Sequence, residues 1–578
     1  MNHIVERLSK SIREYKRDSL LAPVFVALEV VMEVLIPLII AGLIDDGITG
    51  GSMPIIVKLG LTLLLFAIMA LVFGVLAGKY AASASAGFAR NLRHDIFHNI
   101  QNFSFANIDK YSTASLITRM TTDVTNVQNA YQMIIRVAIR CPLMLVFSFL
   151  MVVGINAELS LIFLVLLPIL GIGMYLIITK AHPLFELVFK TYDHLNKVVR
   201  ENLRGIRVVK SYVREDYETR KFRDVSTTIY GYFSSAEKLL AFTSPLMQAI
   251  IYASILLISW FGAQFIVLGN LSTGELVSLI AYTMQILMSL MMLAMVFVMI
   301  TMARASAKRI TEVLDEEIDL KNPDSPVYEV ADGSVEFQNV SFSYTKDQNR
   351  LALKNISLKI TSGETIGILG GTGSSKSTLV QLIPRLYDAT DGAVFVGGRD
   401  VREYDIAALR NAVAMVLQKN ILFAGTIRDN LRWGNRDATE EEIVHACRLS
   451  HADEFVSSLP QAYDTHVEQG GSNFSGGQKQ RLCIARALLK KPKILILDDS
   501  TSAVDTKTDS LIRAAFRTEL PATTKIIIAQ RISSIQDADR ILVLDEGRIT
   551  AEGTHAELLE KDPVYREMYH SQQKGGEE

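Results

Sequence analysis

Six long apolar runs in the first half of the chain constrain its fold more than any other feature. Each run reaches the about 20 residues that a helix needs to cross about 30 Å of hydrocarbon. A bilayer offers no partner to free backbone N–H and C=O groups, so such runs must be helical. The sequence therefore predicts six membrane-spanning helices, within Leu20–Ile44, Pro54–Tyr80, Met133–Ile155, Leu159–Thr179, Phe242–Leu268 and Leu276–Met302.

Composition narrows the class of protein further. The 578 residues carry 59 Lys and Arg against 61 Asp and Glu, a formal charge of −2. That balance excludes binding of nucleic acid through bulk positive charge. The three cysteines, Cys141, Cys447 and Cys483, are too few and too scattered for a disulfide framework or a zinc site.

The placement of basic residues predicts the orientation in the membrane. The short loops at residues 45–51, 156–158 and 269–273 contain no Lys or Arg, whereas the two long connections between spans are rich in both. The positive-inside rule then places the long connections and both termini in the cytosol. The basic segment Arg7–Arg17 is read as a cytosolic lead-in to the first span, because the apolar run behind it is too long for a cleaved signal peptide. The long connections have helical periodicity and few Gly or Pro, which predicts helices extending beyond the bilayer.

A second, soluble domain follows a charged, Pro-containing linker at residues 315–333. The predicted organisation is thus a membrane domain at 1–314, a linker at 315–333 and a soluble domain at 334–578. Short β-rich runs alternate with helical runs in this domain, which predicts an α/β fold with a largely parallel sheet. The predicted strands include Val335–Phe337, Glu364–Leu369, Val413–Leu417, Ile494–Leu497, Lys525–Ala529 and Arg540–Leu544.

A phosphate-binding loop stands between the apolar strand Thr365–Leu369 and a predicted helix. In this context backbone N–H groups and the helix N-terminus hold phosphates, while Lys376 reaches the β- and γ-phosphates and the Ser377 hydroxyl binds magnesium. Ser375 stands where the motif has Gly, and its Cβ restricts the backbone, but the rest of the loop is intact. The predicted ATP ligands here are Gly370, Gly371, Thr372, Gly373, Ser374, Ser375, Lys376, Ser377 and Thr378.

A second acidic motif complements this loop. Four apolar residues, Ile494–Leu497, predict a buried strand that ends at Asp498. A carboxylate at that point can hold magnesium, directly or through water. Together the two motifs predict a site for ATP and Mg²⁺.

The segment Asn473–Arg481, which reads NFSGGQKQR, resembles the signature motif of ATP-binding cassette (ABC) proteins. With six preceding spans, the chain resembles an ABC exporter half-transporter over nearly its whole length. The resemblance implies a six-helix all-α membrane domain fused to an α/β P-loop domain. It also implies that Tyr344 stacks on adenine, that Gln418 links the γ-phosphate and magnesium to the membrane domain, and that the loop Ser502–Asp505 crosses a cassette dimer interface. The signature residues that would contact ATP on the opposite cassette are Ser475, Gly476, Gly477 and Gln478.

Two residues depart from the family pattern at hydrolytic positions. Asp499 stands where the family usually has Glu, and it is one methylene shorter. Gln530 stands where the family has His, and it cannot carry imidazolium charge. Both departures affect catalysis while the binding motifs remain, so we expect a weak ATP site here and a heterodimer with a chain that carries Glu and His. The alternative is that both residues are tolerated variants of an active site.

The membrane half contains three further features. By resemblance, short helices within Ser104–Asp123 and Asn202–Glu218 dock onto the cassettes. Glu29 and Glu33 in the first span could pair with two arginines of the third, Arg136 and Arg140, or line a cavity for cations. Methionines recur at helical spacing between residues 284 and 302. They could form a flexible surface that binds cargo, or they could simply pack against other helices or lipid.

These observations favour an ATP-driven exporter subunit for amphiphilic or drug-like compounds, in the plasma (inner) membrane, with cytosolic cassettes. A homodimeric lipid or peptide exporter remains an alternative. An ATP-gated channel or regulator that does not pump is another, since Asp499 and Gln530 permit it.

Overall fold

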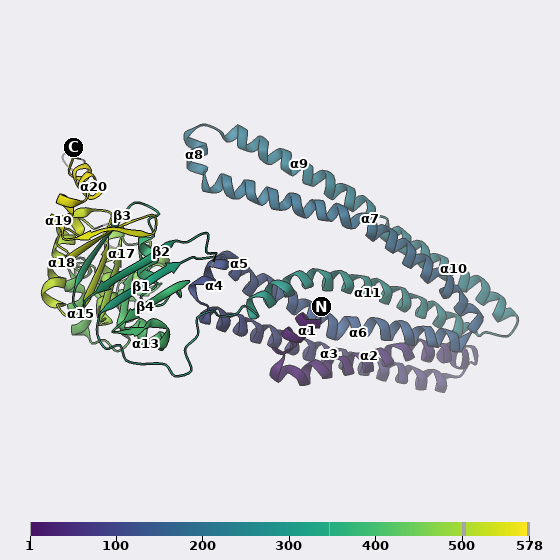
Figure 1. The fold of residues 1–578 in the computed structure, drawn as a ribbon. Helices are drawn as coiled ribbons and strands as arrows, with labels where there is room; N and C mark the ends of the chain where they lie inside the picture. Colours follow the sequence, from purple (N-terminus) through teal and green to yellow (C-terminus); the bar gives the residue numbers. More distant parts are fainter. Residues whose placement is uncertain (1, 346, 500–503, 575–578) are drawn as a thin grey trace. The chain divides into compact units, whose positions relative to one another are not determined.

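The structure is a computed structural model, and it describes residues 2–345, 347–499 and 504–574. The chain divides into two units. The first comprises the chain up to Ile100 together with Thr113–Asp315, and the second comprises Gln101–Ser112 together with the chain from Glu316 onward. The short segment 101–112 therefore belongs with the C-terminal unit, although the neighbouring chain on both sides belongs with the first (Figure 1).

The first unit is all-helical. Among the described residues, six helical segments are long and apolar enough to cross a membrane, which confirms the predicted six spans. They are Arg13–Thr49, Met53–Asn102, Thr113–Ile155, Ala157–Arg204, Glu215–Val267 and Thr273–Leu314. The helical elements of the first unit include α1 (Asn2–Ser9), α2 (Lys16–Gly42), a π-helical turn (Leu43–Thr49), α3 (Met53–Asn102), α5 (Thr113–Thr118), α6 (Val124–Ile155), α7 (Ala157–Arg204), α8 (Ile206–Ser211), α9 (Glu215–Leu240), α10 (Thr243–Val267) and α11 (Thr273–Leu314).

Polar side chains fix the helix ends at the short loops. Asn156 caps α7 by accepting hydrogen bonds from the backbone N–H groups of Glu158 and Leu159. Ser272 and Glu275 form a capping box at the start of α11. Side-chain acceptors thus mark the starts of α7 and α11.

The second long connection is helical, as the periodicity predicted. α7 runs to Arg204, the short α8 turns the chain, and α9 packs back along α7 (Figure 1). The apolar side chains of Val198, Val225 and Ile229 form the small core of this hairpin. This packing lets α7 and α9 continue well beyond the length that a bilayer requires.

The second unit contains a six-stranded sheet with the order β12-β11-β3-β10-β9-β6, in which only β12 runs antiparallel to its neighbour. The largely parallel sheet is therefore confirmed. Its strands are β3 (Thr365–Gly370), β6 (Val413–Val416), β9 (Ile494–Asp498), β10 (Thr524–Ile528), β11 (Arg540–Asp545) and β12 (Arg548–Gly553). The central strands β9 and β10 are buried on both faces, as their continuous apolar runs require, whereas the edge strand β12 alternates exposed and half-buried residues.

A four-stranded antiparallel sheet, with the order β2-β1-β4-β5, was not predicted. It comprises β1 (Val335–Phe342), β2 (Leu353–Ile360), β4 (Asp391–Val396) and β5 (Arg399–Asp400), and a two-stranded ribbon joins β7 (Gly425–Thr426) to β8 (His466–Val467). The helices of this unit are α4 (Phe105–Lys110), α12 (Lys376–Gln381), α13 (Ile406–Ala412), α14 (Ile427–Arg432), α15 (Glu440–Leu449), α16 (Asp453–Val456), α17 (Gly476–Leu489), α18 (Thr506–Glu519), α19 (His555–Lys561) and α20 (Pro563–Lys574).

Candidate functional site

The predicted phosphate loop lies between β3 and α12, as the motif requires. Gly371, Thr372 and Gly373 are exposed, whereas Ser374 and Thr378 are buried beneath the loop. Gly370 must lack a side chain, because a Cβ there would come within 2.3 Å of the Leu544 carbonyl oxygen. The loop therefore presents its exposed backbone at the start of α12, the arrangement that holds phosphates.

Ser375 occupies the left-handed region, with φ of 72° and ψ of 25°. This region strongly favours glycine, which the motif has at this position. The Cβ of Ser375 thus adds local strain to the loop.

Lys376 and the end of β9 form the charged part of the site. The Lys376 ammonium donates to the carbonyls of Gly370 and Gly371, both at 2.8 Å. Burial lowers the pKa of Lys376, while the nearby carboxylates of Asp498 and Asp499 oppose that shift. The side chain is placed to transfer its hydrogen bonds from loop carbonyls to phosphate oxygens.

Asp498 and Ser377 supply the oxygen atoms that a magnesium site needs. The Ser377 hydroxyl donates to Asp498 Oδ1 at 2.9 Å, and Asp498 is 5% exposed. Burial raises the pKa of Asp498 because its charged form loses hydration, and a bound cation would offset that loss. Mg²⁺ commonly binds one or two protein oxygens together with phosphates and water, so this pair fits it. No cluster of three or more His, Cys, Asp or Glu suited to a metal occurs in the described part of the chain.

Asp499 is held by two side-chain amides. Its Oδ2 accepts from Gln530 Nε2 at 2.9 Å and from Gln418 Nε2 at 3.4 Å. Burial raises the pKa of Asp499, and the hydrogen bond from Gln418 opposes that shift. The structure thus brings together the three residues that the sequence assigned to hydrolysis and to the link with the γ-phosphate.

Tyr344 stands beside the same loop. Its hydroxyl lies 2.9 Å from Thr378 Oγ1, and its ring makes edge contacts with Phe342 and Tyr387. About half of the side chain is exposed, at 49%. An exposed ring fixed at the phosphate helix is suited to stacking on a base.

The signature segment caps its own helix. Ser475 is the N-cap of α17 and forms a capping box with Gln478, while Gly476 and Gly477 open the first turn. Asp505 caps α18 by accepting from Thr508 N at 2.9 Å, and this hydrogen bond lowers the pKa of Asp505. Ser502 and Ala503 lie outside the described residues.

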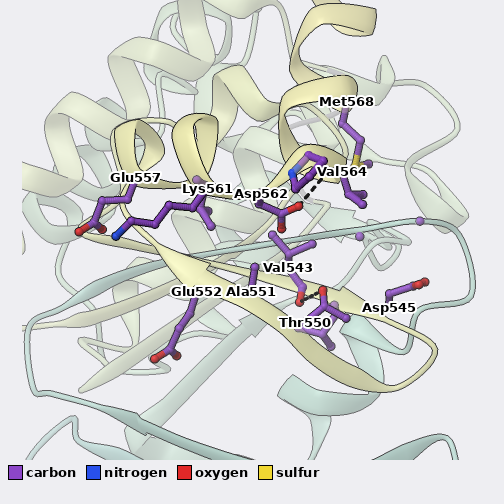
Figure 2. Close-up of a pocket in the computed structure, with 15 residues that line it drawn as sticks. Val543, Asp545, Thr550, Ala551, Glu552, Glu557, Lys561, Asp562, Val564 and Met568 are labelled. Carbon is purple, nitrogen blue, oxygen red and sulfur yellow. Dashed lines mark hydrogen bonds between the residues drawn. The ribbon is translucent and has the colours of Figure 1, made fainter.

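A separate pocket of about 690 Å³ lies between the β11–β12 hairpin and helices α19 and α20 (Figure 2). It reaches the phosphate loop only at Gly370 and Gly371. Its charged lining is mainly acidic, and consists of Asp545, Glu552, Glu557, Asp562 and Lys561. Because that charge repels a triphosphate, this pocket is not the ATP site.

The charged residues of the membrane helices pair within the chain. Arg140 donates to Glu29 Oε1 at 2.5 Å and to Glu33 Oε2 at 2.6 Å. Arg136 instead lies against α3 at Gly78. If Gly78 carried a Cβ atom, the Arg136 guanidinium would lie 3.6 Å from it. The predicted pairing is therefore confirmed for Arg140, which serves both carboxylates.

The predicted methionine stripe runs along one side of α11. The stripe consists of six positions: Met284, Met288, Met291, Met295 and Met302 are 42–64% exposed on this chain, and Met299 is half-buried. None of these six side chains is buried by the chain's own described residues, so the stripe must face lipid, cargo or a second chain.

Two residues near the site were missed by sequence reasoning. Tyr387 packs against Tyr344 and donates a hydrogen bond to Asp109, which is 278 residues away in the sequence. No local spacing signals such a contact. The only available hint was the position of Tyr387 shortly after the phosphate helix α12.

Comparison with known proteins identifies the class of this chain. The profile for the ABC transporter transmembrane region matches residues 19–291, and the ABC transporter profile matches residues 353–502. The uncharacterized ABC transporter ATP-binding protein YfiB of Bacillus subtilis is 38% identical over 98% of both chains. An uncharacterized ABC transporter ATP-binding protein of Mycobacterium tuberculosis is 37% identical over 98% of this chain and 97% of its own length. The ATP-dependent lipid A-core flippase of Desulfotalea psychrophila is 34% identical over 84% of both chains.

The chain therefore belongs to the ABC transporter family, in its exporter-type half-transporter branch. It is an integral membrane protein with an ATP-binding domain, and it is an ATPase coupled to transport.

Proposed function

We propose that this chain is the weak-site subunit of a heterodimeric ABC exporter that moves amphiphilic or drug-like compounds out of the cytosol. The observation that carries the proposal concerns Asp499, whose side chain is one methylene shorter than the usual Glu. Its Oδ2 already accepts hydrogen bonds from Gln530 and Gln418. A general base must reach the attacking water, and a displacement of about 1 Å can cost on the order of 100-fold in rate.

In the proposed pair, two cassettes meet head to tail around two ATP molecules. One site uses the phosphate loop of this chain, with Lys376 on the β- and γ-phosphates and Tyr344 on adenine. Asp498, Ser377 and Gln418 would hold Mg²⁺ there, and the metal would supply charge neutralisation for the phosphates. This site binds ATP and turns over slowly.

In the second proposed site, the phosphate loop belongs to the partner and the signature motif belongs to this chain. Ser475, Gly476, Gly477 and Gln478 face the phosphate loop of the partner, whose Glu and His complete hydrolysis. Asp505 lies at the interface and orients the start of α18. Hydrolysis at this second site drives alternating access in the membrane domain. The motion passes from the cassette (334–578) through the linker (315–333) to the membrane domain (1–314).

The charge pattern of the loops supports an orientation with both termini and the cassette in the cytosol. The plasma (inner) membrane is the location that we propose. Lipid is a second candidate cargo, and it is favoured by the similarity to a lipid A-core flippase.

The test is the rate of phosphate release by the purified full chain in lipid nanodiscs, alone and co-purified with a half-transporter that carries Glu and His. We expect the pair to hydrolyse ATP on the order of 100-fold faster than this chain alone. Equal rates for the two preparations would contradict the heterodimer. Uptake of fluorescent amphiphilic dyes or labelled phospholipid into inverted vesicles then separates the two cargo classes, and ATP binding without uptake of either would favour a gate or regulator.

A further inference from the structure

Helix α4 (Phe105–Lys110) is attached to the cassette on two sides. Its segment, Gln101–Ser112, forms one compact unit with the chain from Glu316 onward. The helix itself is short and begins with a capping box between Ser104 and Asn107. A six-residue helix has little stability of its own, so side-chain contacts must hold it in place.

The first side is aromatic. Tyr387 donates a hydrogen bond of 2.6 Å to Asp109 Oδ2 at the end of α4, and the ring of Phe105 makes an edge contact with Tyr387. Tyr387 is only 8% exposed, and burial together with the Asp109 carboxylate raises its pKa. Because Tyr387 also packs against Tyr344, α4 contacts the aromatic cluster that we assign to adenine.

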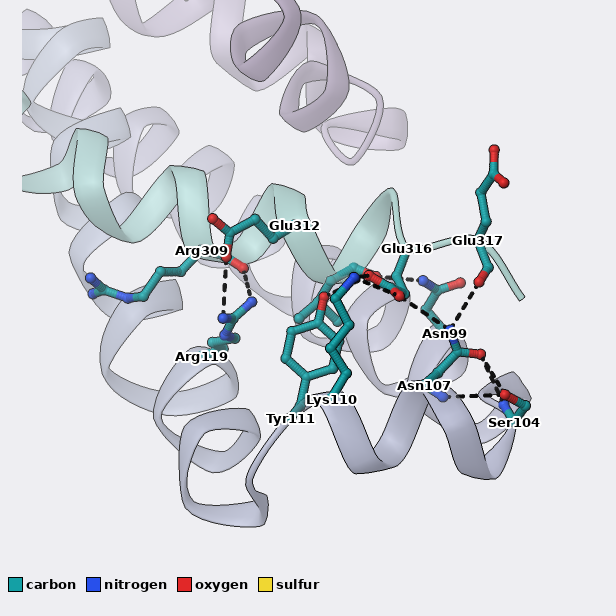
Figure 3. Close-up of polar contacts among 11 residues, drawn as sticks. Asn99, Ser104, Asn107, Lys110, Tyr111, Arg119, Arg309, Glu312, Glu316 and Glu317 are labelled. Atoms are coloured by element: carbon teal, nitrogen blue, oxygen red, sulfur yellow. Dashed lines mark hydrogen bonds and ion pairs between the residues drawn. The ribbon is translucent and has the colours of Figure 1, made fainter. Parts of the chain in front are cut away.

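The second side is the start of the linker. The Glu316 carboxylate accepts hydrogen bonds from Lys110 Nζ at 2.7 Å, Tyr111 OH at 2.8 Å and Asn107 Nδ2 at 3.2 Å (Figure 3). The Glu316 side chain is 13% exposed. Burial alone would raise its pKa, but the three hydrogen bonds outweigh burial, and the pKa of Glu316 is lowered. The ionised carboxylate is therefore the form that holds α4.

Glu317 provides an internal comparison. Only its backbone carbonyl joins the network, by accepting from Asn107 Nδ2 at 2.9 Å, and its side chain is exposed and points away from α4 (Figure 3). Two adjacent acidic residues thus differ in one respect, since Glu316 alone uses its carboxylate to bind α4.

We propose that Glu316 is a positioning residue that clamps α4 against the cassette, so that the linker, α4 and the adenine aromatics respond to ATP as one piece. Tyr387 connects α4 to the nucleotide side, and Glu316 connects it to the chain that follows α11. Without the clamp, ATP still binds, but the response of the membrane helices to ATP is lost. The inference requires only the ATP-coupled exporter class and does not depend on the cargo or on the identity of the partner.

The experiment compares Glu316→Ala with the matched control Glu317→Ala, each in the full chain co-purified with its partner in nanodiscs. Amide hydrogen exchange of residues 104–111 should rise about tenfold in Glu316→Ala, the effect of losing a hydrogen bond to a charged group, and stay unchanged in Glu317→Ala. Lys110→Met, which removes a donor from the other side of the same contact, should shift the exchange in the same direction.

A second measurement separates positioning from general damage. The affinity for a fluorescent ATP analogue should stay within about twofold of wild type in Glu316→Ala, a change that corresponds to less than half a kcal/mol. The ATP-dependent change in hydrogen exchange at the ends of α6 and α11 nearest the linker should be lost. Equal exchange at residues 104–111 in the two alanine variants, or a parallel loss of ATP binding in Glu316→Ala, would overturn the proposal.

Discussion

Replacing Asp499 by Glu and Gln530 by His should convert the ATP site that we propose to be weak into a hydrolytic one. The extra methylene advances the carboxylate by about 1 Å, and a misplacement of that size costs on the order of 100-fold. That factor corresponds to about 2.7 kcal/mol of activation free energy. The His substitution also removes the Gln530 amide, which now donates to Asp499 Oδ2 at 2.9 Å. We therefore expect phosphate release by the double variant to rise on the order of 100-fold over the wild-type chain alone.

The assay is steady-state phosphate release with Mg²⁺ and saturating ATP, from the full chain in nanodiscs. Lys376→Ala gives the baseline without productive phosphate binding. Asp499→Asn, added to Gln530→His, keeps the shape of the residue and removes the charge, so it should stay at that baseline. If the double variant hydrolyses ATP no faster than wild type, or if the wild-type chain alone already matches the co-purified pair, then the shortened carboxylate does not limit this site and the reasoning fails.

Three further predictions rest on single contacts. Ser375→Gly relieves a left-handed backbone and should stabilise the chain by up to about 1 kcal/mol in thermal unfolding, and a lower melting temperature would contradict it. Arg140→Met leaves two membrane carboxylates without their shared cation and should destabilise the chain by about 3–5 kcal/mol, much more than Arg136→Met, as measured by thermal unfolding in detergent. The lowered pKa of Glu316 means that its stabilisation is fully present above the usual carboxyl value of 4.5 and is lost as pH falls through the lower folded value. The protection factor of the α4 amides, which corrects for the slower intrinsic exchange at acid pH, should therefore fall with pH in wild type but not in Glu316→Ala.

Much of the fold could be predicted from the sequence because the relevant signals are local. An apolar run of about 20 residues must be a helix in a membrane, whatever surrounds it. A strand, a Gly-rich turn and a Lys-Ser pair define a phosphate loop within a dozen residues. The antiparallel sheet β2-β1-β4-β5 was not predicted, although Val335–Phe337 at the start of β1 was predicted as a strand. Two register shifts along β1 interrupt the regular alternation of buried and exposed residues, which weakens the period-two signal.

The candidate site was predictable residue by residue but not contact by contact. Asp499 and Gln530 were recognised as departures from a pattern, yet their mutual hydrogen bond depends on the parallel pairing of β9 with β10. Likewise, the choice of Arg140 rather than Arg136 as the partner of Glu29 depends on how α2, α3 and α6 pack. Helical spacing alone leaves both pairings open.

The sequence by itself determined the two-part design of this protein: six spans and an ATP-binding cassette, with Ser375 in the phosphate loop and with Asp499 and Gln530 as departures from the family pattern. These features follow from the length of the apolar runs, from short motifs and from the chemistry of single residues, all of which are local in the sequence. The resemblance to ABC exporters implied a short helix within Ser104–Asp123 that docks onto a cassette. Only the tertiary structure decided which side chains hold α4 there: Tyr387 through Asp109 and Phe105, and Glu316 through Asn107, Lys110 and Tyr111. These contacts join residues more than 200 positions apart, and the free energy that selects them comes from burial and hydrogen bonding, which exist only once the chain has folded.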